Sequence, residues 1–194
     1  MKNNLGPHSI IGILALILLF SACNSGFLPF NTTLAVQTER MSAVNLTEKR
    51  VLIVSYDSEL TQEFVISLKN YVKEELKTHN IVVERLNIRH NETATDIEEL
   101  NKVKSTFTPD YLLSLKVRDE RIRKMYIIGS HVKTLRGMTL YFNLLPIASA
   151  ENEGTFLWRS TVKINHFYNN ESVFTAKKVA KELGIKMQKD SIVN

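Results

Sequence analysis

The sequence predicts an α/β (α+β) domain, built as a single mixed β-sheet with helices packed on it. Apolar runs typical of buried strands alternate with helical stripes in the middle of the chain. Two strand–helix–strand crossovers there imply parallel pairing at the start of the sheet. Two later runs alternate apolar and polar residues, as antiparallel strands with one covered face do. The predicted order is therefore βαβαβββα, with a parallel start and an antiparallel hairpin finish.

Composition places the chain among globular proteins. Its 194 residues suffice for one domain with some extra length, and 44% are hydrophobic and 23% charged. A single cysteine excludes an internal disulfide. The formal net charge of +5 is mild and no basic run is dense, so we predict no nucleic-acid partner.

The domain begins with a strand and an amphipathic helix. Residues 50–56 have the sequence RVLIVSY and are apolar on both faces, as in a central strand. Asp57 and Ser58 then offer an N-cap. Lys69 and Lys73 lie on the polar side of the helix that follows, opposite an apolar stripe. The stripe comprises Leu60, Phe64, Leu68, Tyr71, Val72 and Leu76.

A second strand–helix–strand unit follows the first. Residues 81–89 form its strand, and Thr95 with Glu98 makes a capping box for a helix whose apolar stripe reaches Phe107. A Pro-Asp pair stops that helix before a third strand, residues 111–117.

The last third of the chain predicts an antiparallel hairpin and a final helix. Residues 138–144 and 156–164 alternate apolar and polar side chains, and residues 151–154 make the turn between them. Trp158 falls on the covered face of the second strand. The helix spans residues 172–190, with an apolar stripe of Val173, Ala176, Ala180, Leu183 and Met187.

The N-terminus carries a targeting segment. After one lysine, residues 10–20 are apolar apart from a glycine, a run too short to span a membrane permanently. The sequence LFSAC that closes this run resembles the lipobox of bacterial lipoproteins. The resemblance implies signal cleavage between Ala22 and Cys23, and lipidation of Cys23. The alternative is a buried, inert cysteine, but its position where the segment should end favours lipidation.

This cleavage site divides the chain into three predicted segments. Residues 1–22 are predicted to be a lipoprotein signal peptide, residues 23–49 a lipidated N-terminus and tether, and residues 50–194 a single α/β domain. Asn24 resembles the residues that permit sorting to the outer membrane, so the predicted location is the cell envelope, lipid-anchored at the outer membrane and facing the periplasm.

From residue 50 onward the sequence resembles a superfamily of envelope lipoproteins and periplasmic domains. It includes the N-terminal domain of the Tol-system β-propeller protein, the curli-secretion channel lipoprotein and the lipoprotein activators of penicillin-binding proteins. The resemblance implies this element order, and its motifs are structural, with Gly154 in a turn and Trp158 in the core. They are TPDYLLSLKV (108–117), SAENEGTFLWRSTV (149–162) and AKKVAKELGIKMQKDSIV (176–193).

No pattern typical of a catalytic or metal site occurs. The five histidines are scattered without zinc-ligand spacing, and the seven glycines form no phosphate-binding motif. A hydrolase triad would require Ser55, Asp57 and His131 to converge, but a strand, a helix cap and a hairpin explain them better. We therefore predict no catalytic residue, no metal and no cofactor, and a protein that is not an enzyme.

Residues 116–136, KVRDERIRKMYIIGSHVKTLR, form the most basic segment. It continues the third strand past its core face and turns at Gly129 and Ser130. It is either a solvated hairpin or a contact surface for anionic headgroups, cell-wall polymer or an acidic protein face. We predict that it carries the interaction function, with partner-binding residues Arg118, Arg121, Arg123, Lys124, Lys133 and Arg136.

Together these features favour a non-catalytic cell-envelope lipoprotein that acts as an accessory or assembly factor through protein–protein contacts. Its expected partners are the membrane, through the lipid anchor, an envelope protein and further copies of itself. The alternatives are a hydrolase acting on cell-envelope material and an oligomeric secretion-channel subunit. Without converging catalytic groups, the first interpretation is favoured.

Overall fold

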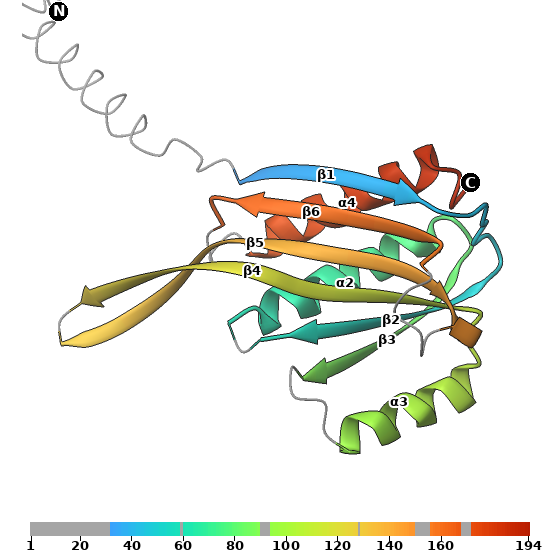
Figure 1. Ribbon diagram of the computed structural model, residues 1–194, viewed down its shortest axis with the longest axis horizontal. Coiled ribbons are helices and arrows are strands. Elements are labelled where there is room, and N and C mark those ends of the chain that lie inside the picture. The colour runs from blue at the N-terminus through green and yellow to red at the C-terminus, as the bar shows by residue number, and fades with distance from the viewer. Residues whose placement is uncertain (1–31, 59, 90–93, 128, 150–155, 168–171) are drawn as a thin grey trace, which may run out of the picture. The chain divides into compact units, whose positions relative to one another are not determined.

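The computed structural model describes residues 32–58, 60–89, 94–127, 129–149, 156–167 and 172–194. These residues form one six-stranded mixed sheet with three α-helices packed on it (Figure 1), which confirms the predicted fold class. The elements are β1 (Thr33–Arg40), β2 (Arg50–Asp57), α2 (Gln62–Lys77), β3 (Val82–Arg89), α3 (Ala94–Phe107), β4 (Tyr111–Ile127), β5 (Ser130–Pro146), the short 3-10 helix η1 (Ile147–Ser149), β6 (Trp158–Asn165) and α4 (Ser172–Lys189).

The strands lie in the order β1-β6-β5-β4-β2-β3. β2 pairs in parallel with β3 and with β4, because α2 and α3 are the crossovers that return the chain to the same end of the sheet. β4, β5, β6 and β1 pair in antiparallel fashion. The parallel start and the antiparallel finish are thus as predicted, while the predicted turn at 151–154 lies outside the described residues.

β1 departs from the prediction. Residues 33–40 belong to the stretch predicted as tether, so that prediction is wrong for them and a strand precedes the predicted order of elements. β1 pairs with β6 along its whole length. Leu34 and Val36 are half-buried against the main core, whereas Thr33, Ala35 and Gln37, which alternate with them, are exposed. Residues 23–31 lie outside the described residues.

The two faces of the sheet are covered unequally. α2 and α4 pack on one face, where they lie behind the sheet in Figure 1, and enclose the main core. α3 covers only one end of the other face, over a small cluster around Leu52 and Val54 that also includes Leu112 of β4 and Leu145 of β5. Among the described helices, none covers the rest of that second face over β4, β5, β6 and β1, and we call this area the open face.

Lys69 of α2 lies where the sequence did not predict it. Its side chain is only 3% exposed, and its Nζ donates a hydrogen bond to the carbonyl oxygen of Leu86 at 3.2 Å. The predicted polar position is wrong because β3 runs beneath this part of α2, and the carbonyl offers a partner within the core. The aliphatic stem of a lysine can be buried when its amine reaches such a group.

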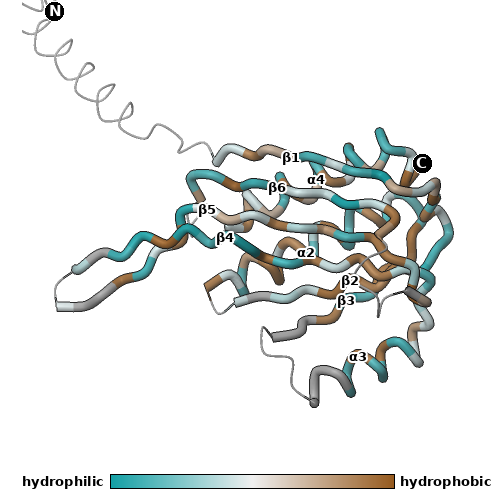
Figure 2. The backbone as a smooth tube through the Cα atoms, in the orientation of Figure 1, coloured by the Kyte–Doolittle hydropathy of each residue, from teal (hydrophilic) through white to brown (hydrophobic). Residues whose placement is uncertain are grey.

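β4 and β5 both extend beyond the other strands and form a two-stranded hairpin, which projects away from the helices (Figures 1 and 2). We call residues 121–137 the arm. A bulge at its base interrupts the pairing between Arg118 and Arg121, and Asp119 there has a φ of 51°. A Cβ added at Gly137 would lie 2.6 Å from the backbone oxygen of Ile164, so the base of the arm requires a glycine.

Candidate functional site: a basic groove and a basic arm

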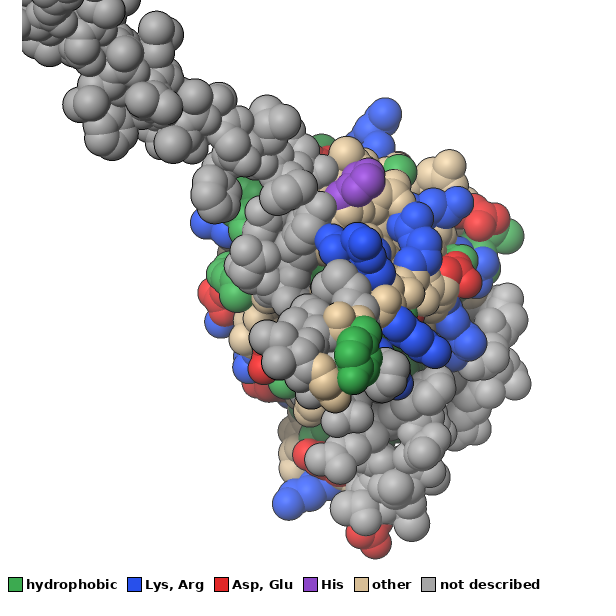
Figure 3. Space-filling view, turned by 90° about the vertical axis from the view of Figure 1, so that its left-hand side faces the viewer, with side chains coloured by type: hydrophobic (Ala, Val, Ile, Leu, Met, Phe, Trp, Pro, Cys, Tyr) green, Lys and Arg blue, Asp and Glu red, His purple; other side chains and the backbone are tan. Residues whose placement is uncertain are grey.

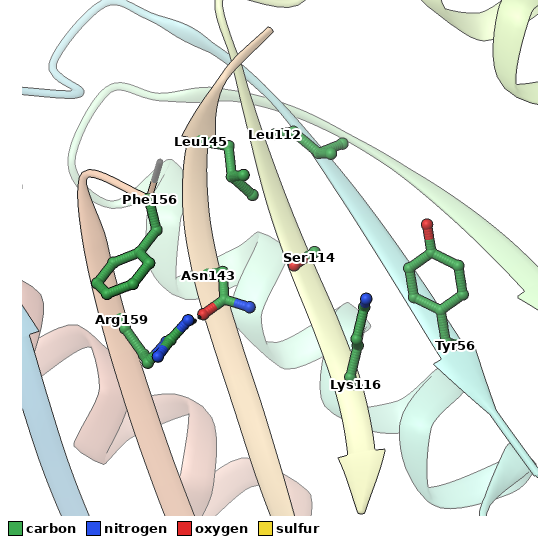
Figure 4. Close-up of a pocket in the computed structure, with 8 residues that line it drawn as sticks. All are labelled: Tyr56, Leu112, Ser114, Lys116, Asn143, Leu145, Phe156 and Arg159. Carbon is green, nitrogen blue, oxygen red and sulfur yellow. Dashed lines mark hydrogen bonds between the residues drawn. The ribbon is translucent and has the colours of Figure 1, made fainter. Parts of the chain in front are cut away.

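The open face is hollowed into two adjoining pockets of about 170 and 410 Å³. Both are lined by Lys116, Asn143 and Arg159, so they form one continuous groove, which we call the basic groove. Figure 4 shows its smaller part. The remaining lining residues are Tyr56, Leu112, Ser114, Leu145 and Phe156 in the smaller pocket, and Arg118, Asp119 and Tyr141 in the larger.

Strand register brings these side chains together. Ser114, Asn143 and Arg159 occupy one row across β4, β5 and β6, and Lys116 and Tyr141 occupy the next position along. Because successive side chains in a strand point to opposite faces, these residues alternate with those that fill the main core. The basic groove is therefore built on paired strands, which hold its side chains in fixed relative positions.

Two cations of the basic groove are held by neighbouring groups (Figure 4). Arg159 donates from Nε to Asn143 Oδ1 at 2.7 Å, and its guanidinium lies 3.8 Å from the centroid of the Phe156 ring. Lys116 Nζ lies 5.2 Å from the centroid of the Tyr56 ring. The three partners, Asn143, Phe156 and Tyr56, are half-buried. A guanidinium fixed in this way is pre-organised for carboxylate or phosphate oxygens.

Positive charge dominates this end of the molecule. The described lining of the basic groove contains Lys116, Arg118 and Arg159 against one carboxylate, Asp119. Viewed from the end where the arm protrudes, lysine and arginine side chains gather near the centre of the face (Figure 3). Such a surface attracts anionic groups.

The structure divides the six predicted partner-binding residues into three sets. Arg118 belongs to the basic groove. Arg121 holds the base of the arm to β6, because its Nη2 donates to the carbonyl oxygen of Ile164 at 2.9 Å and also bonds Asn165. Arg136 lies half-buried at the same base.

The third set lies on the outer part of the arm. Arg123, Lys124 and Lys133 are exposed there, and Lys124 is directly opposite Lys133 in the pairing of β4 with β5. The six residues therefore do not form one surface. The structure brings three of them together on the arm, places one in the basic groove and gives Arg121 a structural role.

The groups of the alternative hydrolase triad do not converge. Ser55 is buried in β2 beside Leu115 of β4, whereas His131 pairs with Tyr126, which lies roughly 35 Å further along β4. Within the described residues, no group of three or more His, Cys, Asp and Glu side chains is arranged to hold a metal ion. That the protein is not an enzyme stays a prediction.

The predicted lipidation site lies outside the described residues, so the roles of Ala22 and Cys23 stay predictions. Of the helices in the described part of the chain, none has the length and apolar character needed to cross a membrane.

Sequence patterns alone missed most of the basic groove. Tyr56, Asn143 and Arg159 were not singled out, although each is a polar or aromatic residue on the strand face opposite the core. The signal that could have found them is the period-two alternation itself, because it assigns Asn143 and Arg159 to the uncovered side of two strands that pair with each other.

Comparison with known proteins gives distant structural likenesses. No protein-family model and no curated protein sequence matches the chain. It is similar to the PelC dodecamer from Paraburkholderia phytofirmans, at 18% identity over 78% of this chain and 96% of that one, with a TM-score of 0.49. It is also similar to a PDZ domain protein from Parabacteroides distasonis, at 13% identity over 81% and 36%, with a TM-score of 0.42.

A further similar structure is a minor lipoprotein from Acinetobacter baumannii. The identity is 13% over 76% of this chain and 96% of that one, and the TM-score is 0.36. Membership of this chain in the envelope superfamily that its sequence resembles stays a prediction.

Proposed function

We propose that the protein is a non-catalytic, lipid-anchored accessory factor of the bacterial cell envelope, and that it binds an acidic surface of a protein partner through the basic groove. The observation that supports this is the groove itself, where Lys116, Arg118 and Arg159 are gathered on an uncovered face of the sheet. The anchor at Cys23 would hold the domain at the outer membrane, facing the periplasm.

The chemistry of the basic groove suits a protein partner. Arginine and aromatic residues are enriched at protein interfaces, and here Arg159 lies against Phe156 while Tyr141 lines the neighbouring wall. Paired strands fix these groups before a partner arrives, so little side-chain entropy is lost on binding. The groove is a shallow hollow on a sheet, which a protruding acidic segment can enter.

Site-specific photo-crosslinking in cells tests this proposal. A photoreactive residue in place of Tyr141, in the full-length lipidated protein, should yield an adduct with a defined acidic protein. Because the contact is electrostatic, the adduct should decrease at raised salt, and decrease at least tenfold when Lys116→Gln and Arg159→Gln are combined.

The matched controls use the opposite side of the molecule. The same photoreactive residue at Lys177, which is exposed on α4, should give no such adduct, and Lys177→Gln with Lys181→Gln should leave the Tyr141 adduct unchanged. Equal adducts from both positions, or an adduct that tolerates loss of the groove cations, would contradict the proposal. Self-association and the secretion-channel alternative stay predictions.

A further inference from the structure

The outer part of the arm combines exposed cations with exposed apolar side chains. Arg123, Lys124 and Lys133 are exposed. Three large apolar or aromatic side chains lie among them, and their exposed fractions are 41% for Ile122, 69% for Tyr126 and 39% for Val132. Among the described elements, none packs on this ribbon. The arm therefore presents both kinds of group to its surroundings.

The positive charges on the arm destabilise the pairing of its two strands. Lys124 stands directly opposite Lys133, and like charges at such positions destabilise a strand pair. A two-stranded hairpin is only marginally stable in water. Neither of the ion pairs found within the described residues involves Arg123, Lys124 or Lys133. An anionic surface beside the arm would relieve this repulsion.

The arm leaves the sheet at the end where β1 begins. One row of paired residues runs from Thr33 through Asn165 and Gly137 to Arg121, at the base of the arm. Only nine residues, 24–32, separate β1 from the predicted lipidation site, so the ten chain steps from Cys23 to Thr33 span at most about 35 Å.

The length of the arm falls within this distance. From Arg121 to Ile127 the strand extends by roughly 20 Å, and it does so from the end of the sheet to which the anchor is connected. The membrane surface that holds the acyl chains of Cys23 is therefore within reach of the arm. α4 also lies at this end, because Lys178 Nζ donates to the carbonyl oxygen of Thr32 at 3.3 Å, but α4 packs on the sheet whereas the arm projects beyond it.

We propose that the outer arm lies on the anionic phospholipid surface into which the acyl chains of Cys23 insert. This inference rests on the lipid anchoring in the proposed function. Clusters of lysine and arginine beside a membrane anchor bind anionic headgroups, and tyrosine favours the membrane–water interface. An acidic protein would account for the cations alone. The exposed Ile122 and Tyr126, which share one face of the ribbon with Lys124 and Lys133 at the anchored end, favour the membrane.

Fluorescence of a probe on the arm tests the inference with the full-length lipidated protein. Val132→Cys supplies a thiol for an environment-sensitive dye, because the thiol of Cys23, the chain's own cysteine, would be blocked by its lipid in the lipidated protein. The protein is placed in vesicles of phosphatidylcholine alone, or of phosphatidylcholine and phosphatidylglycerol in equal parts. The expected result is a blue-shifted emission, several-fold stronger in the anionic vesicles, that declines as salt is raised.

Charge variants identify the groups responsible. Arg123→Gln, Lys124→Gln and Lys133→Gln combined should lower the docking equilibrium by about 100-fold, since each cation near an anionic membrane contributes about a factor of five. The matched control removes the same charge from α4 with Lys177→Gln, Lys181→Gln and Lys189→Gln, and should leave the Val132 signal unchanged. Both variants should unfold at the temperature of the parent protein.

The outcomes separate this inference from the proposed function. Flotation with neutral vesicles reports the acyl anchor, and a protein that does not float overturns both. A protein that floats but keeps the Val132 probe in water in anionic vesicles overturns the docking of the arm alone. So does a signal that is equal in neutral and anionic vesicles, or one that appears only when an acidic protein is added.

Discussion

Trp158 joins two layers of the domain. Its side chain is fully buried in β6, and its Nε1 donates to Asp190 Oδ2 at 2.8 Å, just beyond the end of α4. The burial was predicted, because Trp158 shares its strand face with Val162 and Ile164, and it is confirmed. The hydrogen bond was not predictable. The alternation of apolar and polar residues places Trp158 on one face of the strand, but it does not indicate which residue of the helix layer lies opposite its Nε1. The same reason explains the buried Lys69.

Substitution of Trp158 should test this joint. Trp158→Ala should lower the free energy of unfolding by about 3–5 kcal/mol, because it removes a large side chain from a close-packed core. Trp158→Phe should cost less, since it keeps most of the apolar volume while leaving Asp190 without its donor. Urea denaturation followed by circular dichroism measures both. Equal stability of the two variants and the parent protein would refute the role assigned to this residue.

β1 is the one strand of the sheet that the sequence pattern did not predict. The strands and helices of the main core were predicted because burial imposes strong apolar periodicity on them, and the continuation of β4 into a charged hairpin was predicted from the same pattern. β1 is an edge strand with the sequence TLAVQTER, and only Leu34 and Val36 are large apolar residues. Two such residues do not define a period.

Leu34→Ala combined with Val36→Ala tests the pairing of β1. Both side chains are half-buried against the core, so the double variant should lower the free energy of unfolding by about 2 kcal/mol. Gln37→Ala, on the exposed face of the same strand, is the control and should change little. Thermal unfolding is the measurement. If residues 33–40 were only a tether, neither variant would shift the transition.

The whole molecule assembles its candidate site from distant parts of the sequence. Lys116, Asn143 and Arg159 come from three strands and meet only through the register of β4, β5 and β6. The cations of the arm were predicted because they are contiguous in sequence, whereas the basic groove depends on pairings that no local pattern reports. The anchor, by contrast, depends on a contiguous motif.

The anchor is tested by replacing its cysteine. Cys23→Ala should leave the precursor without acyl chains, because the thiol to which the first lipid would attach is missing. Metabolic labelling with a fatty-acid probe, followed by detection of the probe on the purified protein, measures this directly. Ser21→Thr keeps the thiol and serves as the control, which should retain its label. Label on the Ala variant would rule out lipidation at this site.

β1 also determines how the anchored domain responds to mechanical force. A pull on acyl chains at Cys23 would act along residues 23–32 and load the hydrogen bonds between β1 and β6. Detachment of β1, together with loss of the bonds from the Met41 and Ser42 amides to the carbonyl oxygen of Leu157, would free the chain as far as Val44, which is buried in the main core. The link would then lengthen from about 35 Å to about 70 Å with no bond cleaved. If Cys23 is lipidated as proposed, release of this edge strand would double the distance that the link between membrane and domain can span while the core stays folded.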